Sequence, residues 1–179
     1  MRLRVLGSAV VVAVTMGGCA TTTAGPAVPG PAAPAAVNPT DVAWLQLVVP
    51  MTENALAAAR LAPEHAESPH VRSAAEACTG PLEQLLGRLR AVRDRAGLPA
   101  ADVHSGHRMP GMVTAADLVA LRSERGAGFD RRLVALLRAH AAQLVVLAGG
   151  EQANGADAET RELARVAGAE GARETELLG

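Results

Sequence analysis

The sequence predicts an all-α protein, a four-helix bundle made from a duplicated helical hairpin. Trp44 and Phe129 are the only aromatic residues among 179, and 49% of the residues are apolar, so Leu, Val and Ala must build the core. Such side chains suit close-packed helices better than sheets. Long stretches also repeat their apolar residues at spacings of three and four, which is the period of a helix buried along one face.

Residues 1–18 have the pattern of a bacterial lipoprotein signal peptide. Arg2 and Arg4 precede an apolar run, and Gly17 and Gly18 stand directly before Cys19. This order of charged, apolar and small residues is typical of a cleavable export signal, and the run is shorter than the roughly 20 residues that span a bilayer. We expect lipid attachment at Cys19 and anchoring on the extracytoplasmic face of the cell membrane. A plain secretory signal is the alternative.

Residues 19–37 are expected to form a disordered tether between the lipidated Cys19 and a folded domain. The stretch is rich in Pro, Ala, Thr and Gly and offers no large apolar side chain for a core. Its four prolines also exclude a regular helix. The folded domain is therefore predicted to occupy residues 38–179.

The first predicted helix begins at Asn38 and runs to about Leu61. Asn38 can cap the helix, Pro39 suits its first position, and Asp41 stabilises its first turn through the helix dipole. Pro50 is expected to kink it.

A second helix is predicted from Ser68 and Pro69 until Gly97 stops it, with a bend at Gly80 and Pro81. Residues 98–113 contain several Pro and Gly residues and are predicted to be a long connection. Thr114 then caps a short helix that reaches about Glu124.

The central predicted helix covers residues 129–148. Its inner stripe recurs at spacings of three and four and consists of Leu133, Leu136, Leu137, His140, Leu144 and Leu147. Gly126 and Gly128 are expected to precede this helix, and Gly149 and Gly150 to end it. A last helix is predicted over 157–178, with an inner stripe of Leu163, Val166, Ala167, Glu170, Glu174 and Leu177.

The two halves of the chain have a similar pattern. Residues 41–59 and 130–148 each begin with Asp, continue with apolar residues, and lead through a polar turn into an Arg-, Ala- and Glu-rich helix.

The chain resembles the bacterial domain of unknown function 305 family over about 41–178. The motifs that carry the resemblance are Met109-Pro110-Gly111-Met112, Ala116-Asp117-Leu118-x-x-Leu121, Gly126-x-Gly128-Phe129-Asp130, and His140 with Ala148.

This resemblance implies a ferritin-like bundle in which two helices carry a His-His pair and the helix after each carries Gln-x-x-Glu-x-x-x-Met. The chain departs from that pattern at most positions. Met51-Thr52 and His140-Ala141 replace the His pairs, and the other implied positions hold Leu82, Leu85, Leu89, Gly171, Glu174 and Leu178. His140 and Glu174 are the polar residues that remain, so most of the implied metal donors are lost.

His140 and Glu174, joined by Met51, are one candidate metal site, because imidazole, carboxylate and thioether are all metal donors. The alternative is that His140 and Glu174 pair with each other in the interior, as buried polar groups must.

A second candidate metal site lies in the connection, where His104, His107, Met109 and Met112 form H-x-x-H-x-M-x-x-M. Such soft donors suit copper, Cu(I) especially. The alternative is a structural link with two solvent-exposed histidines.

The remaining classes are excluded by composition and missing motifs. A net charge of −1 and two aromatics argue against nucleic-acid binding. No nucleophile motif or phosphate loop occurs, and Cys78 lies on an apolar helical face as core filler. We expect a non-enzymatic cell-envelope lipoprotein that acts as an interaction or structural module, with a second copy or an envelope protein as its partner. The alternative is a copper-binding or metal-buffering envelope protein; apart from copper, no cofactor is expected.

Overall fold

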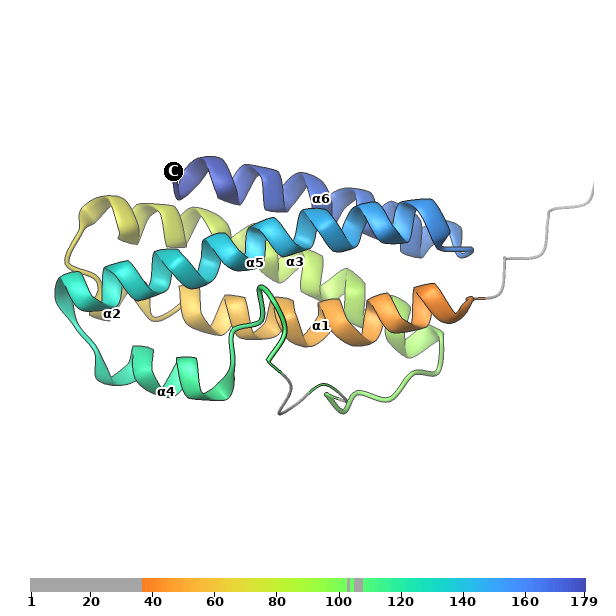
Figure 1. Cartoon of the computed structure of the whole chain (residues 1–179), viewed down its shortest axis with the longest axis horizontal. Helices are drawn as coiled ribbons and strands as arrows, with labels where there is room; N and C mark the ends of the chain where they lie inside the picture. The colour runs from red at the N-terminus through yellow and green to blue at the C-terminus, as the bar shows by residue number, and fades with distance from the viewer. Residues whose placement is uncertain (1–36, 103, 105–107) are drawn as a thin grey trace, which may run out of the picture. The chain divides into compact units, whose positions relative to one another are not determined.

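The computed structural model describes residues 37–102, 104 and 108–179, which contain six helices and no strand (Figure 1). The all-α prediction is confirmed. The predictions for the signal peptide, for Cys19 with nearly all of the tether, and for His107 fall outside the described residues. The helices are α1 (Pro39–Ala59), α2 (Ala62–His65), α3 (Pro69–Arg95), α4 (Ala115–Ser123), α5 (Gly126–Asn154) and α6 (Ala158–Leu177).

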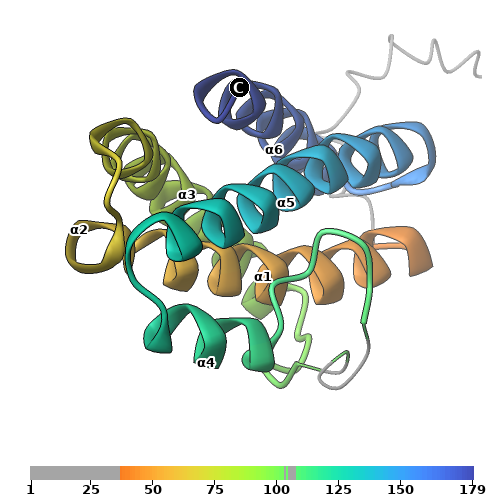
Figure 2. The ribbon, with the colours of Figure 1, turned by 60° about the vertical axis from the view of Figure 1, so that its left-hand side comes forward.

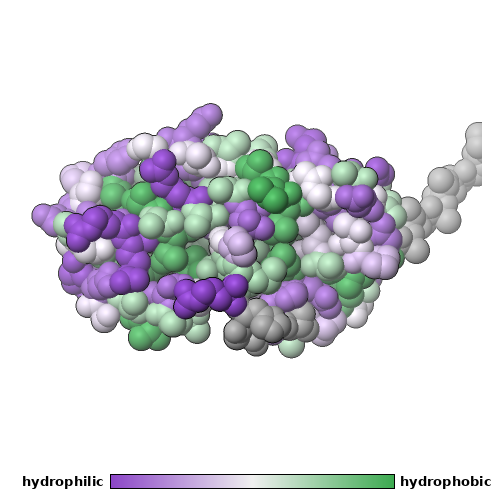
Figure 3. All heavy atoms as spheres, viewed as in Figure 1, coloured by the Kyte–Doolittle hydropathy of each residue, from purple (hydrophilic) through white to green (hydrophobic). Residues whose placement is uncertain are grey.

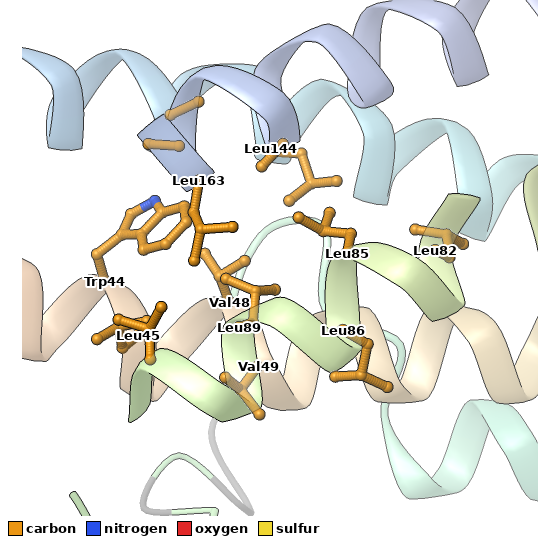
Figure 4. Packing of buried hydrophobic residues seen from close by; sticks show 14 of the residues in the cluster. Trp44, Leu45, Val48, Val49, Leu82, Leu85, Leu86, Leu89, Leu144 and Leu163 are labelled. Atoms are coloured by element: carbon orange, nitrogen blue, oxygen red, sulfur yellow. The ribbon is translucent and has the colours of Figure 1, made fainter. Parts of the chain in front are cut away.

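Four long helices form the body of the domain. Helix α5 packs along α6 and α1 along α3, and these pairs are joined by contacts of α1 with α5 and of α3 with α6. Figure 2 shows α4 lying beside α1, outside the four long helices. Aliphatic side chains from all four long helices meet in the interior, as Figure 4 shows for Val48, Leu85, Leu144 and Leu163. A second cluster surrounds Phe129.

The helix starts follow local capping chemistry. The Asn38 side chain accepts from the Thr40 and Asp41 backbone N–H groups at 2.8 and 2.9 Å, and the Asp41 carboxylate accepts from Asn38 N–H. Ser68 caps α3 and Asp157 caps α6 in the same way. Thr114 forms a capping box at the start of α4. The predicted starts at Asn38, Ser68 and Thr114 are confirmed.

The two halves of the chain also cap each other. The Asp41 carboxylate of α1 accepts from the backbone N–H groups of Ala156 and Asp157, which lead into α6. The Asp130 carboxylate of α5 accepts from the N–H of Ser68 at 2.8 Å and from Glu67 at 3.2 Å, directly before α3. Each half therefore supplies an aspartate that stabilises the start of the other half's second helix.

The predicted limits of the central helix are wrong at both ends. Helix α5 begins at Gly126 and continues through Gly149 and Gly150 to Asn154. Ala148 and Glu151 are buried on either side of these glycines, so tertiary contacts hold the helix together where glycine alone would weaken it.

The first helix ends two residues earlier than predicted, at Ala59, and the short α2 follows it because Ala62 and His65 are buried. Helices α1 and α3 both continue through their internal prolines, Pro50 and Pro81.

The predicted inner stripes are correct only in part. In α6, Leu163, Ala167 and Glu174 are buried, whereas Val166, Glu170 and Leu177 are half-buried. Glu170 instead forms an ion pair with Arg173. In α5, Leu136 and Leu147 are likewise half-buried, because the helix contacts its neighbours over a narrower face than the apolar stripe covers.

Candidate functional site

His140 of α5 and Glu174 of α6 form a polar pair inside the domain. His140 Nδ1 lies 3.3 Å from Glu174 Oε2, and both side chains are 0% exposed. Among the described residues, no hydrogen-bond partner reaches His140 Nε2 or Glu174 Oε1. The pair is therefore sealed from solvent and half satisfied, and each residue is the other's polar contact.

The close approach of α5 and α6 beside this pair depends on Gly171. A Cβ atom at this position would lie 2.5 Å from the Ala141 carbonyl oxygen and 3.1 Å from Leu144 Cβ. Position 171 is one of those at which the sequence differs from the motif that the resemblance implies. The structure gives a steric reason for glycine there. A longer side chain there would separate the helices that hold His140 and Glu174.

The other positions that the resemblance directs inward are buried here as well. Met51, Thr52, Leu82 and Leu89 are 0% exposed and Leu85 is 2% exposed. The three leucines supply no metal donor, so these positions lack the ligands that the resemblance implies.

Cys78 of α3 is a buried free thiol, and the charge of Glu174 acts on it. Burial, followed by the negative charge of Glu174, raises the pKa of the Cys78 thiol to about 12. The thiol stays protonated at neutral pH and is a poor nucleophile.

The methionines form a separate cluster. Met51 of α1 and Met112 of the connection are buried together with Leu47, and Met109 packs against them. The structure thus joins a residue of the first predicted metal site with two residues of the second. The sequence did not reveal this grouping, since Met51 is far along the chain from the other two.

His104 belongs to the same predicted metal site as Met109 and Met112 and lies earlier in the connection. It is half-exposed, and its backbone N–H donates to the Asp102 carboxylate at 2.8 Å.

The two groups of candidate metal ligands, the His140–Glu174 pair and the methionine cluster, differ in how well they suit a metal ion. Within residues 37–102, 104 and 108–179, no group of three or more His, Cys, Asp or Glu side chains is arranged to hold a metal ion. His140 and Glu174 supply two donors, fewer than a closed tetrahedral site requires. Met51, Met109 and Met112 carry thioethers, the donor type that suits a soft ion such as Cu(I), and pack in one cluster.

Two buried polar features were missed from the sequence. His65 of α2 places Nδ1 3.1 Å from the Leu121 carbonyl oxygen and 3.0 Å from that of Glu124, where α4 ends. Asp41 and Glu151 lie together at the other end of the long helices. Asp41 and Asp130 begin the two similar halves of the chain, and this repeated aspartate was the sequence signal that could have pointed to the Asp41–Glu151 pair.

The fold and its interior define an all-helical domain with a buried polar pair between its last two helices. The family model for the domain of unknown function DUF305 matches residues 41–178, and the chain belongs to this family. No curated protein matches the chain.

Two solved structures share the fold. A DUF305 fragment from Deinococcus radiodurans has 23% sequence identity and a TM-score of 0.71, and the match covers 82% of this chain and 95% of that one. A DUF305 protein from Streptomyces coelicolor, described as a proposed secreted protein, has 19% identity and a TM-score of 0.66, with 78% and 89% coverage.

Proposed function

We propose that this protein is a non-enzymatic envelope lipoprotein whose helical domain works as an interaction module. The domain would be a ferritin-like four-helix bundle, held on the extracytoplasmic face of the membrane by lipid on Cys19 and by the tether of residues 19–37. The description of the Streptomyces coelicolor relative as a proposed secreted protein supports an extracytoplasmic location. The sealed His140–Glu174 pair, which no solvent reaches, supports a function exerted at the surface.

The observation that carries this proposal is the outer side of α5. An 18-residue window of this helix has a mean hydropathy of 1.6, high enough for a membrane span by composition, yet only 33% of the window is buried. Val145 is 43% exposed and Val146 is 65% exposed. Figure 3 shows groups of hydrophobic residues, with polar residues between them, on the face that α5 crosses in Figure 1. An exposed apolar helix face of this kind is typical of a surface that a second protein covers.

Cross-linking in intact membranes tests the interaction. We expect the full-length chain to give a discrete cross-linked species, containing either a second copy or an envelope protein, and Val146→Arg to abolish it. Val119→Arg is the matched control, because Val119 of α4 is 64% exposed but lies on another helix. Equal cross-linking in both variants would contradict the proposal.

The anchor is tested separately by labelling with palmitate. The wild-type chain should incorporate the label and partition into detergent, whereas Cys19→Ala should do neither. If Cys19→Ala is labelled and membrane-bound like the wild type, the anchor is wrong.

A second candidate function, copper binding, is favoured by the methionine cluster of Met51, Met109 and Met112. Thioethers prefer soft ions and would hold Cu(I), which suits a metal buffer; Met51 and Met112 are buried and Met109 is half-buried. Titration of the full-length chain with Cu(I) in detergent tests this. Met51→Leu and Met112→Leu should weaken binding, and His140→Ala should leave it unchanged. Binding that survives both methionine variants would contradict this assignment.

A further inference from the structure

Asp41 lies buried where α1 begins and where the chain turns from α5 into α6. Its carboxylate is 0% exposed and accepts hydrogen bonds from the backbone N–H groups of Asn38 at 2.6 Å, Ala156 at 3.1 Å and Asp157 at 3.2 Å. These donors belong to the starts of two helices, so the ionised form of Asp41 is well stabilised.

Glu151, in the last turn of α5, brings a second carboxyl group to this place. It is 1% exposed, and among the described residues no donor reaches either of its carboxyl oxygens. The turn of Gly155 and Ala156 lies against both carboxyl groups, since Ala156 N–H donates to Asp41 and a Cβ atom at Gly155 would lie 2.0 Å from Glu151 Oε1. Asp41 also acts on the pKa of Glu151 through a hydrogen bond and through its charge. Two ionised carboxylates are both acceptors and cannot bond to each other, so a proton on Glu151 is what would satisfy the contact.

Burial and the neighbouring carboxylates place that proton on Glu151. Burial, then the hydrogen bond to Asp41, then the negative charges of Asp41 and Asp157 raise the pKa of Glu151 to about 8, and Arg161 of α6 opposes this. Burial acts to raise the pKa of Asp41 too, but its hydrogen bonds bring the value below the ordinary one. The cation nearest this end on α3, Arg95, is exposed and paired with Glu159.

The other half of the chain has the aspartate without the second carboxyl group. Ala62 follows Asp41 by 21 residues, as Glu151 follows Asp130 by 21 residues. Asp130 caps α3 through Glu67 and Ser68 N–H, and the position related to Glu151 is alanine. Capping at this point of the fold therefore does not require a carboxyl partner.

Gly155 covers the pair closely. A Cβ atom there would lie 2.0 Å from Glu151 Oε1, although the φ of Gly155, −66°, is open to any residue. The requirement for glycine is therefore steric, because a side chain at Gly155 would displace the Glu151 carboxyl group from its place under the turn.

We propose that Asp41 and Glu151 form a proton-binding latch, in which one shared proton fastens the start of α1 to the turn between α5 and α6 and is released as the surroundings become alkaline. Above this transition two buried carboxylates face each other and the turn loosens next to the point where the tether leaves the domain.

The sign of the pH effect follows from the raised pKa of Glu151, which is about 8 in the folded domain against the ordinary 4.5. The stabilisation is complete below the ordinary value and is lost as the pH rises through the folded value. Resistance to urea should therefore fall between about pH 5 and pH 8.

The test is urea unfolding of the full-length chain in detergent, followed by circular dichroism across this pH range. Wild type should show a falling urea midpoint, and Glu151→Gln, which keeps a neutral donor toward Asp41, should remove most of the fall. Glu162→Gln is the matched control, because Glu162 is an exposed partner of Arg165 on α6 and should leave the alkaline fall unchanged. A wild-type slope in Glu151→Gln would overturn the proposal.

A direct titration keeps the proposal falsifiable even if Glu151→Gln fails to fold. Carbon-13 NMR of the glutamate carboxyl groups of the wild-type chain should show one that titrates near pH 8, with protection of the Ala156 and Asp157 amides lost over the same range. The Glu67 and Ser68 amides, which Asp130 binds, should stay protected and are the internal control. Ordinary titration of every glutamate would overturn the latch.

Discussion

The His140 side chain is fully buried, and its described hydrogen-bond partner is Glu174. Its bond to Glu174 is 3.3 Å long, and the remaining polar atoms of both side chains have no described partner. Such a pair contributes little net stability when intact, yet loss of one member leaves the other buried without compensation. In this structure His140 and Glu174 are each other's hydrogen-bond partner, and two donors are fewer than a closed tetrahedral metal site requires.

At this scale we predict that His140→Ala and Glu174→Ala each lower the free energy of unfolding by about 1–3 kcal/mol, because each leaves a buried polar group unsatisfied. The double variant should recover part of the summed loss. Urea unfolding at pH 7 measures all three. Glu162→Ala, which removes an exposed ion pair with Arg165, is the control and should cost less than about 1 kcal/mol. Simple additivity of the two single variants would contradict coupling.

The packing of α5 on α6 is decided by small residues at their contact. A Cβ atom at Gly171 of α6 would lie 2.5 Å from the Ala141 carbonyl oxygen of α5, whereas one at Gly128 of α5 would have no atom of another segment within 4 Å. These two glycines therefore respond differently to the same substitution, since only the first faces another helix.

For the elements we predict opposite effects of two Gly→Ala substitutions on thermal stability. Gly171→Ala should destabilise the domain by about 1–3 kcal/mol through overpacking against the Ala141 carbonyl oxygen. Gly128→Ala, the control, should stabilise it by about 0.5–1 kcal/mol, because alanine loses less conformational entropy in a helix. Melting curves of both variants check this, and a stabilised Gly171→Ala would show that α5 and α6 are held apart by other residues.

At the scale of the whole molecule, the described members of both aliphatic clusters lie between Trp44 and Leu178. The tether residues predicted from the sequence have no large apolar side chain to add to that core.

We therefore expect a chain shortened to residues 38–179 to fold on its own, with a strongly helical far-UV circular dichroism spectrum and the melting temperature of the full-length protein in the same detergent. Loss of cooperative melting on removal of residues 1–37 would show that the tether takes part in the fold. A spectrum dominated by strand from a well-folded sample would contradict the all-α assignment.

The sequence by itself determined the helical class, the starts of most helices and the position of the polar pair. These features are local: Asn38, Ser68 and Thr114 cap through groups only a few residues away, and apolar spacing places His140 on the inner face of its helix. The resemblance to the DUF305 family rested on such short motifs, and the family match over residues 41–178 confirms it.

Only the tertiary structure decided where α5 ends and which distant residues meet. Gly149 and Gly150 favour a stop, yet burial of Ala148 and Glu151 carries the helix to Asn154. Met51 meets Met109 and Met112, and Asp41 meets Glu151, through packing between segments far apart in the chain. A residue's neighbours across a helix interface depend on how whole helices pack together, and neither apolar period nor capping chemistry contains that information.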